Sequence, residues 1–213
     1  MVAHIICGSP HLWLPEHLSG YVVGVDRGAL KLIEKNIDFN TAIGDFDSVS
    51  EFDRQLIEEK AELVIKLPVD KDVTDCEAAV EHVVEVGYRQ IYLYGATGVR
   101  FDHQFATIGL MLKYAKRGIQ IYMVDKKNKI SVLAPWTHNI QRDANIQLDI
   151  KEYISFFALE NTVKNLTLQD VKYPLKGYDL SVDDSLCVSN EALQPLIRVS
   201  FDSGYLLVVQ SSD

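Results

Sequence analysis

Hydrophobic positions along the first 125 residues follow two alternating patterns. Short apolar runs, such as 2–7 and 21–25, are followed by glycine or aspartate, which is typical of buried strands in a parallel sheet. Between the runs, apolar residues recur at helical spacing, as in Ala29, Leu30, Ile33 and Ile37. The same patterns predict further strands at 41–43, 62–67, 89–94 and 119–124, and helices at 29–37, 51–61, 75–86 and 102–116.

Residues suited to helix ends support these predicted helices. Ser50 and Thr74 stand where an N-cap would be, because their hydroxyl groups can accept from free backbone N–H groups. Gly87 and Gly118 stand just beyond two predicted helices, where a left-handed residue often ends a helix. Strands that alternate with helices predict a doubly wound, mainly parallel sheet covered on both faces.

The pattern changes after Asp125. Five short β-rich runs follow, at 130–133, 153–159, 163–168, 196–201 and 205–209. Turn residues separate them, among them Asn161, Pro174, Gly177 and the pair Ser203-Gly204. Regular short strands with frequent turns predict an all-β sandwich or barrel. We therefore expect an α/β domain over residues 1–127, followed by a C-terminal β-sandwich domain over 128–213.

Polar motifs follow four of the strands predicted in the first domain. They are Asp26-Arg27-Gly28, the run 44–48 (Gly-Asp-Phe-Asp-Ser), the run 70–75 (Asp-Lys-Asp-Val-Thr-Asp) and the run 95–103 (Gly-Ala-Thr-Gly-Val-Arg-Phe-Asp-His). Ligands of doubly wound sheets bind at the carboxyl ends of the strands. The four motifs are therefore expected to converge on one crevice.

Two of these motifs are acidic. Asp45 and Asp47 are two residues apart after an apolar stretch, so they point the same way if the strand continues. Carboxylates held close together stay ionised when a cation lies between them. Oxygen ligands favour Mg²⁺, which proteins bind through a few carboxylates together with substrate phosphates. The alternative is that these are turn and capping residues; the number of acidic motifs favours metal–phosphate chemistry.

The run 95–103 has the parts of a phosphate-binding loop. Gly95 and Gly98 allow backbone N–H groups to approach an anion, and the following helix offers its positive end. Arg100 could form a forked contact with phosphoryl oxygens. Asp102 is better suited to cap the helix than to bind metal, while His103 could be structural or catalytic. The Gly-x-x-x-x-Gly-Lys-Ser/Thr motif is absent, which excludes a P-loop enzyme.

Composition narrows the choice of partners and compartment. The net charge of −9 argues against nucleic acid and against an anionic membrane surface. Cys7, Cys76 and Cys187 are few and widely spaced, which fits a reducing compartment without disulfides. We see no secretion signal and no apolar run near the ~20 residues of a membrane helix. A cytoplasmic location is expected.

In order and spacing, the runs 44–48, 70–75 and 95–103 resemble the motifs of the thiamine pyrophosphokinase family. Ser189-Asn190 is similar to the element with which that family holds thiamine. The resemblance implies an α/β catalytic domain, a β-sandwich domain and a homodimer with its active site at the subunit interface. It also implies Mg²⁺-dependent transfer of the pyrophosphoryl group of ATP to the hydroxyl of thiamine, which gives thiamine diphosphate and AMP.

The resemblance assigns roles to individual residues. Those expected to be catalytic are Asp45, Asp47, Asp72, Asp75 and Arg100, the four aspartates also being the Mg²⁺ candidates. Residues expected to bind the nucleotide are Asp26, Gly28, Ser48, Lys71, Thr74, Gly95, Gly98, Arg100, Asp102 and His103. Ser189 and Asn190 are expected to bind thiamine, although the pair alone would be read as a β-turn.

Two positions depart from the family's pattern. Arg27 stands where glycine is usual, so it could add a cation beside the phosphates or point to solvent. Thr107 stands near the place of a usual asparagine. Two other functions remain open: a different Mg²⁺-dependent nucleotide pyrophosphotransferase or kinase on the same scaffold, and a non-catalytic thiamine- or nucleotide-binding protein.

Overall fold

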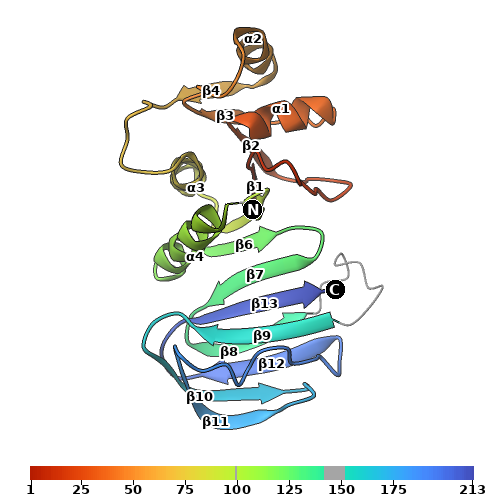
Figure 1. The fold of residues 1–213 in the computed structure, drawn as a ribbon, viewed down its shortest axis with the longest axis vertical. Coiled ribbons are helices and arrows are strands. Elements are labelled where there is room, and N and C mark those ends of the chain that lie inside the picture. Colours follow the sequence, from red (N-terminus) through yellow and green to blue (C-terminus); the bar gives the residue numbers. More distant parts are fainter. Residues whose placement is uncertain (99, 142–151) are drawn as a thin grey trace. The chain divides into compact units, whose positions relative to one another are not determined.

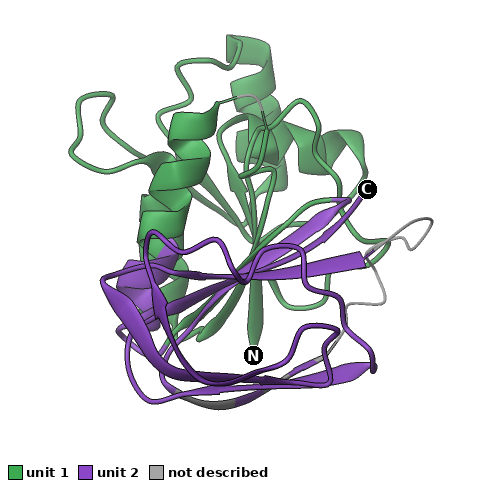
Figure 2. Cartoon of the chain, turned by 60° about the horizontal axis from the view of Figure 1, so that its bottom comes forward, with its two compact units in different colours: residues 1–110, 119–125 green, residues 111–118, 126–213 purple. Residues whose placement is uncertain are grey.

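The computed structural model describes residues 1–98, 100–141 and 152–213 (Figure 1). Val99, within the predicted glycine-rich loop, lies outside the described residues. The chain forms two compact units (Figure 2). Unit 1 comprises residues 1–110 and 119–125, and unit 2 comprises 111–118 and 126–213.

The sheet of unit 1 has six parallel strands in the order β4-β3-β2-β1-β5-β6. Their bounds are β1 Val2–Ile6, β2 Tyr21–Val25, β3 Thr41–Gly44, β4 Leu63–Lys66, β5 Gln90–Tyr94 and β6 Gln120–Val124. The chain adds strands outward from β1 to β4, then returns to place β5 on the other side of β1. The strand order therefore reverses between β1 and β5, and the carboxyl ends of these two strands flank the topological switch point.

Helices cover both faces of this sheet. They are α1 Arg27–Glu34, α2 Glu51–Lys60, α3 Asp75–Val86 and α4 Phe101–Ala115, the last of which runs from unit 1 into unit 2. Leu32 of α1 and Ile57 of α2 pack in one apolar cluster with alternate sheet residues such as Ile6. On the other face, Tyr21 of β2 donates to or accepts from His82 of α3 at 3.2 Å. The predicted doubly wound architecture is confirmed.

The helix ends follow the expected chemistry at three positions. The hydroxyl oxygens of Ser50 and Thr74 accept from the backbone N–H groups of Asp53 and Glu77, each at 3.1 Å. Gly87 ends α3 in the left-handed conformation with φ of 112°. The fourth helix begins one residue earlier than predicted, so Asp102 lies in its first turn and not at the cap.

Unit 2 is a β-sandwich, as expected. In one layer β7, β13 and β9 pair antiparallel in that order, and the other layer is the four-stranded antiparallel sheet β11-β10-β12-β8. The bounds are β7 Asn128–Leu133, β8 Trp136–Gln141, β9 Glu152–Ala158, β10 Thr162–Gln169, β11 Leu175–Ser181, β12 Leu196–Phe201 and β13 Leu206–Ser212. Side chains from both sheets share one core, for example Phe156 of β9 and Val199 of β12, which are fully buried.

Two strands of unit 2 were not predicted. One is β8, whose sequence mixes polar and apolar residues. The other is β11, where Gly177 was expected to be a turn residue. Gly177 instead lies within the strand at φ of 65°, beside register shifts in β10. An irregular edge strand with a single buried residue lacks the regular apolar alternation that identifies strands in a sequence.

Among the described residues, no helix is both long enough and apolar enough to cross a membrane.

Candidate active site

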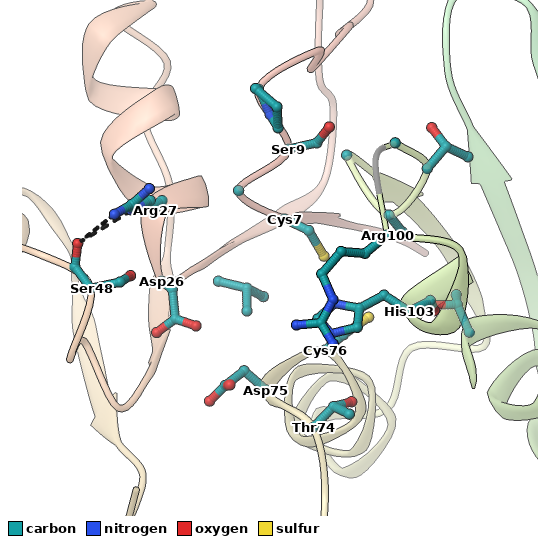
Figure 3. A pocket seen from close by; sticks show the side chains of 18 residues that line it. Cys7, Ser9, Asp26, Arg27, Ser48, Thr74, Asp75, Cys76, Arg100 and His103 are labelled. Atoms are coloured by element: carbon teal, nitrogen blue, oxygen red, sulfur yellow. Dashed lines mark hydrogen bonds between the residues drawn. The ribbon is translucent and has the colours of Figure 1, made fainter. Parts of the chain in front are cut away.

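A cleft of about 370 Å³ opens in unit 1 at the topological switch point (Figure 3). Loops after four strands line it: Cys7–Pro10 after β1, residues 25–27 at the end of β2, Ser48 after β3, and residues 95–98 after β5. The beginnings of α3 and α4 complete the lining, with Thr74, Asp75, Cys76, Arg100, His103 and Thr107. Each of the four polar motifs seen in the sequence contributes residues to this cleft.

At the acidic side of the site, two carboxylates contact one ammonium group and a third carboxylate lies nearby. The Nζ atom of Lys71 lies 3.1 Å from Oδ2 of Asp45 and 3.0 Å from Oδ1 of Asp75. Asp26, which lies beside Asp75 in Figure 3, accepts from the backbone N–H of Phe46 at 3.2 Å. The end of β2, the loop after β3 and the start of α3 are thereby brought together.

The pKa values of the residues in this cluster are shifted in different directions. Burial, together with the negative charges of Asp75 and Asp45, raises the pKa of Asp26 to about 6. The pKa of Asp45 is lowered, first by the N–H of Asp47 and then by Lys71. Hydrogen bonds to Asp75 and Asp45 outweigh burial and raise the pKa of Lys71. The carboxylates therefore hold more negative charge than one ammonium group compensates.

Asp26 also has an unusual backbone conformation, with φ of 46° and ψ of −118°. Non-glycine residues at positive φ are strained and are common at functional sites. The packing around Asp26 explains how this conformation is maintained. A Cβ atom at Gly44 would lie 1.8 Å from Oδ1 of Asp26, so glycine is required there for the carboxylate to reach Phe46.

Asp47 and Asp72 lie on exposed loops outside the cleft lining. The backbone N–H of Asp47 donates to Oδ1 of Asp45 at 3.1 Å, which orients that carboxylate. Within the described parts of the chain, no three histidine, cysteine or acidic side chains are arranged to hold a metal ion. The structure thus brings together Asp45 and Asp75 of the four predicted metal ligands, with Asp26 beside them.

The glycines of the site allow close packing. At Gly28 a Cβ atom would lie 1.9 Å from the carbonyl oxygen of Ile6, so α1 could not start against β1 with any other residue. Gly95 has φ of 68°, and its Cβ would lie 2.5 Å from the carbonyl oxygen of Cys7. At Gly98, with φ of 152°, a Cβ would lie 2.9 Å from Oγ of Ser9. The loops after β1 and β5 therefore lie against each other.

The loop Cys7-Gly8-Ser9-Pro10 was not identified from the sequence as part of the site. A signal was present, because an apolar strand is followed there by glycine and serine, much as polar and glycine residues follow the strands before the four predicted motifs. Cys7 and Cys76 both line this part of the cleft, with their side chains close together (Figure 3). That contact and burial raise the pKa of Cys7, so its thiol stays protonated at neutral pH.

The start of α4 brings further polar side chains to the cleft. Arg100 makes a forked contact with Asp102, with Nε 3.2 Å from Oδ1 and Nη2 2.5 Å from Oδ2. Both side chains are about two-thirds exposed, at 66% and 63%. Gln104 donates to the carbonyl oxygen of Gly98 at 2.6 Å and so ties the glycine loop to the helix. Thr107 donates to the carbonyl oxygen of His103 at 2.8 Å.

Ser189 and Asn190 belong to unit 2. The buried side chain of Asn190 accepts from the backbone N–H groups of Tyr173 and Glu191, at 3.0 and 2.9 Å, and donates to the carbonyl oxygen of Tyr173 at 2.9 Å. Ser189 is exposed at φ of 58°, and its N–H donates to Oγ of Ser155 at 2.9 Å. Asn190 thus fixes the local backbone, whereas the hydroxyl of Ser189 faces solvent.

An open parallel sheet with convergent glycine, arginine and aspartate loops at its switch point defines an α/β protein built to bind a phosphorylated ligand. Comparison with known proteins gives the family. The model "Thiamin pyrophosphokinase, catalytic domain" matches residues 15–123, and "Thiamin pyrophosphokinase, vitamin B1 binding domain" matches 137–206. The chain belongs to the thiamine pyrophosphokinase family, which confirms the resemblance inferred from its motifs.

Individual relatives agree over the whole length. The thiamine pyrophosphokinase of Bacillus subtilis is 34% identical over 216 residues, which cover 99% of this chain and 98% of the relative. The crystal structure of the Bacillus subtilis protein has a TM-score of 0.88 with 33% identity, covering 100% of both chains. That of Geobacillus thermodenitrificans thiamin pyrophosphokinase has a TM-score of 0.86 with 38% identity, covering 100% of this chain and 98% of the other.

Proposed function

We propose that this protein transfers the pyrophosphoryl group of ATP to the hydroxyl of thiamine, producing thiamine diphosphate and AMP. The supporting observation is the cleft at the switch point, where Asp26 and Asp75 line the same cavity as the glycine loop 95–98 and Lys71 links Asp75 to Asp45 just outside the lining. The family's catalytic and vitamin B1 binding domains both match this chain, and membership of that family indicates which substrates the protein uses. A binding protein would not need so many carboxylates beside a phosphate loop.

In this proposal the glycine loop and the start of α4 bind the ATP phosphates. Gly95 and Gly98 leave backbone groups accessible, and Arg100 lies at the edge of the same cleft. Ser48, Thr74 and His103 also line it and would contact the nucleotide. Asp102 would orient Arg100 through the forked contact between them. Lys71 would act on the acidic side, where it already compensates two carboxylates.

The cluster has the chemistry that Mg²⁺ requires. Its donors are carboxylate oxygens, and the pKa of Asp26 is raised first by burial and then by the negative charges of Asp75 and Asp45. A magnesium ion normally takes only one or two carboxylates and completes its shell with water and phosphate. Asp45 and Asp75 would hold the ion directly, with Asp47 and Asp72 on the adjoining loops. When bound, Mg²⁺ would offset the charge that develops on the phosphates.

The reaction depends mainly on the alignment of the thiamine hydroxyl with the β-phosphorus of ATP. The thiamine hydroxyl oxygen attacks the β-phosphorus of ATP, and the bond from that phosphorus to the oxygen bridging to the α-phosphate breaks, releasing AMP. The hydroxyl proton passes to a carboxylate of the cluster. Arg100 stabilises charge on the transferring group. Positioning of the two substrates therefore accounts for most of the rate enhancement.

We assign thiamine binding to Ser189 and Asn190 of unit 2. Because the amide of Asn190 already makes three hydrogen bonds to backbone, the open hydroxyl of Ser189 is the better candidate for direct contact. We further propose a cytoplasmic homodimer with the active site at the subunit interface. Light scattering should then give about twice the chain mass of 24.0 kDa; the single-chain mass would contradict the dimer.

The proposed activity is tested by incubating the protein with ATP, Mg²⁺ and thiamine and separating the products by chromatography. Equal amounts of AMP and thiamine diphosphate are expected. A panel of other alcohols as acceptors, scored for AMP against ADP, distinguishes this reaction from that of a different nucleotide transferase. Binding of ATP and thiamine without any turnover would identify a non-catalytic binding protein and contradict the proposal.

A further inference from the structure

We propose that Arg27 is a nucleotide-binding residue, whose guanidinium group contacts phosphate oxygens of the bound nucleotide. This inference rests on the proposed function and assigns a role to the residue that departs from the family's usual glycine. Arg27 is the first residue of α1 and lines the cleft between the loop after β1 and the loop after β3.

The positive charges around the cleft differ in how they are already used. Lys71 lies between Asp45 and Asp75, at 3.1 and 3.0 Å. Arg100 is paired with Asp102. Arg27 makes no ion pair with any acidic side chain in the described part of the chain. A polyphosphate next to the carboxylate cluster needs compensating positive charge. The charge of Arg27 is not neutralised by a carboxylate of the described residues, so it is available for this purpose.

The guanidinium group is also held in place by the protein. Its Nε and Nη2 atoms both donate to the carbonyl oxygen of Ser48, at 3.2 and 3.1 Å (Figure 3). Ser48 closes the acidic motif after β3, so Arg27 links the start of α1 to that loop. A Cβ atom at Gly8 would lie 2.8 Å from Cβ of Arg27. Glycine at position 8 therefore leaves space for the arginine stem beside the loop after β1.

The anchored group retains donors for a ligand. Arginine has five N–H donors in a planar fork, and the Ser48 carbonyl takes two of them. The remaining N–H groups on Nη1 and Nη2 form a pair suited to phosphate oxygens. A carbonyl partner leaves the positive charge uncompensated, in contrast to the carboxylate partner of Arg100. Arg27 is thus both preoriented and charged for an anion.

The test compares ATP with adenosine, which has the same base and ribose but no phosphate. Both are titrated calorimetrically into the wild-type protein, Arg27→Met, Arg27→Lys and the control Lys31→Met. Lys31 lies on the same helix and pairs with Glu34 at 2.8 Å. Arg27→Met should bind ATP at least about tenfold more weakly while binding adenosine as the wild type does. Arg27→Lys should be intermediate, since it keeps the charge without the fork, and Lys31→Met should be unchanged.

Steady-state kinetics give an independent readout. Arg27→Met should raise KM for ATP and leave KM for thiamine unchanged. Unaltered ATP binding, or an equal loss of ATP and adenosine binding, would overturn the inference, because the second result would mean that Arg27 only supports the fold of the cleft. A wild-type protein that neither binds ATP nor forms thiamine diphosphate would instead refute the proposed function, and this inference with it.

Discussion

The ammonium group of Lys71 lies 3.1 Å from the carboxylate of Asp45, although the two residues are 26 positions apart in the sequence. The same nitrogen lies 3.0 Å from Asp75, one helical turn farther along the chain. All three side chains are largely shielded from solvent, with exposed fractions of 12%, 13% and 23%. Lys71 thus holds together the acidic loop after β3 and the start of α3.

Lys71→Met should therefore impair both stability and turnover. Without the ammonium group, Asp45 and Asp75 repel each other, and Tm at pH 7.5 should fall by about 3–6 °C. Turnover should fall at least about tenfold, because the carboxylates lose their orientation. Thermal unfolding and the product assay measure the two effects. Lys66→Met, which alters an exposed residue of β4, is the control, and equal behaviour of the two variants would refute this role for Lys71.

Asp47→Asn and Asp72→Asn should lower turnover by about two orders of magnitude or more while leaving Tm within about 2 °C of the wild type. Both side chains are exposed, so their removal disturbs no core. Asp70→Asn, an exposed carboxylate of the same loop as Asp72, should be almost fully active. Turnover near that of the wild type in either of the first two variants would show that its carboxylate is only a loop residue.

Substitutions of Asn190 and Ser189, the two residues assigned to thiamine, should affect different properties of the protein. Asn190→Ala removes three hydrogen bonds within unit 2 and should lower Tm by several degrees. Ser189→Ala keeps the backbone contact with Ser155, so Tm should not change, but KM for thiamine should rise about threefold to tenfold. An unchanged KM together with full activity would remove Ser189 from the thiamine site.

The fold could be predicted from the sequence where one periodic pattern dominates. Buried strands such as β1 and β2, and helices with clear caps such as Ser50 and Thr74, belong to this class. The edge strand β11 could not be predicted, because Gly177 reads as a turn residue and only one residue of the strand is buried. Its place is decided by antiparallel pairing with β10, and the two register shifts along this pair leave no regular pattern in the sequence.

For the site, sequence motifs predicted which loops converge but not which side chains meet. Asp26 was expected to bind nucleotide. In the structure it lies close enough to Asp75 and Asp45 for their negative charges to raise its pKa. That proximity depends on the order of strands β1 to β4 and on the lack of a side chain at Gly44. The contact between Cys7 and Cys76 likewise joins β1 to α3, and spacing alone does not encode it.

A buried imidazole provides a prediction about pH. His4, only 7% exposed, has its Nε2 3.2 Å from the carbonyl oxygen of Ser19, while its Nδ1 has no hydrogen-bond partner. Burial outweighs the Ser19 contact and lowers the pKa of His4 from 6.5. The unfolded chain therefore takes up a proton more readily near pH 6.5 than the folded protein does, and stability is lost as the pH falls below that value.

The measurement is Tm between pH 7.5 and 5.5 for the wild type, His4→Phe and His17→Gln. His4→Phe keeps an aromatic ring near Tyr92 and Tyr94 and should show a smaller decrease of Tm over this range. His17 is exposed, so the His17→Gln variant should follow the wild type. The same slope in all three proteins would mean that His4 does not contribute to the pH dependence.

The fate of the individual phosphates of ATP tests the central claim most directly. The protein is incubated with Mg²⁺, thiamine and ATP labelled separately at the β- and the γ-phosphorus, and the products are resolved by chromatography. Pyrophosphoryl transfer predicts that both labels appear in thiamine diphosphate and that the AMP is unlabelled. A γ-label in thiamine monophosphate, with the β-label retained in ADP, would show transfer of a single phosphoryl group and contradict the account.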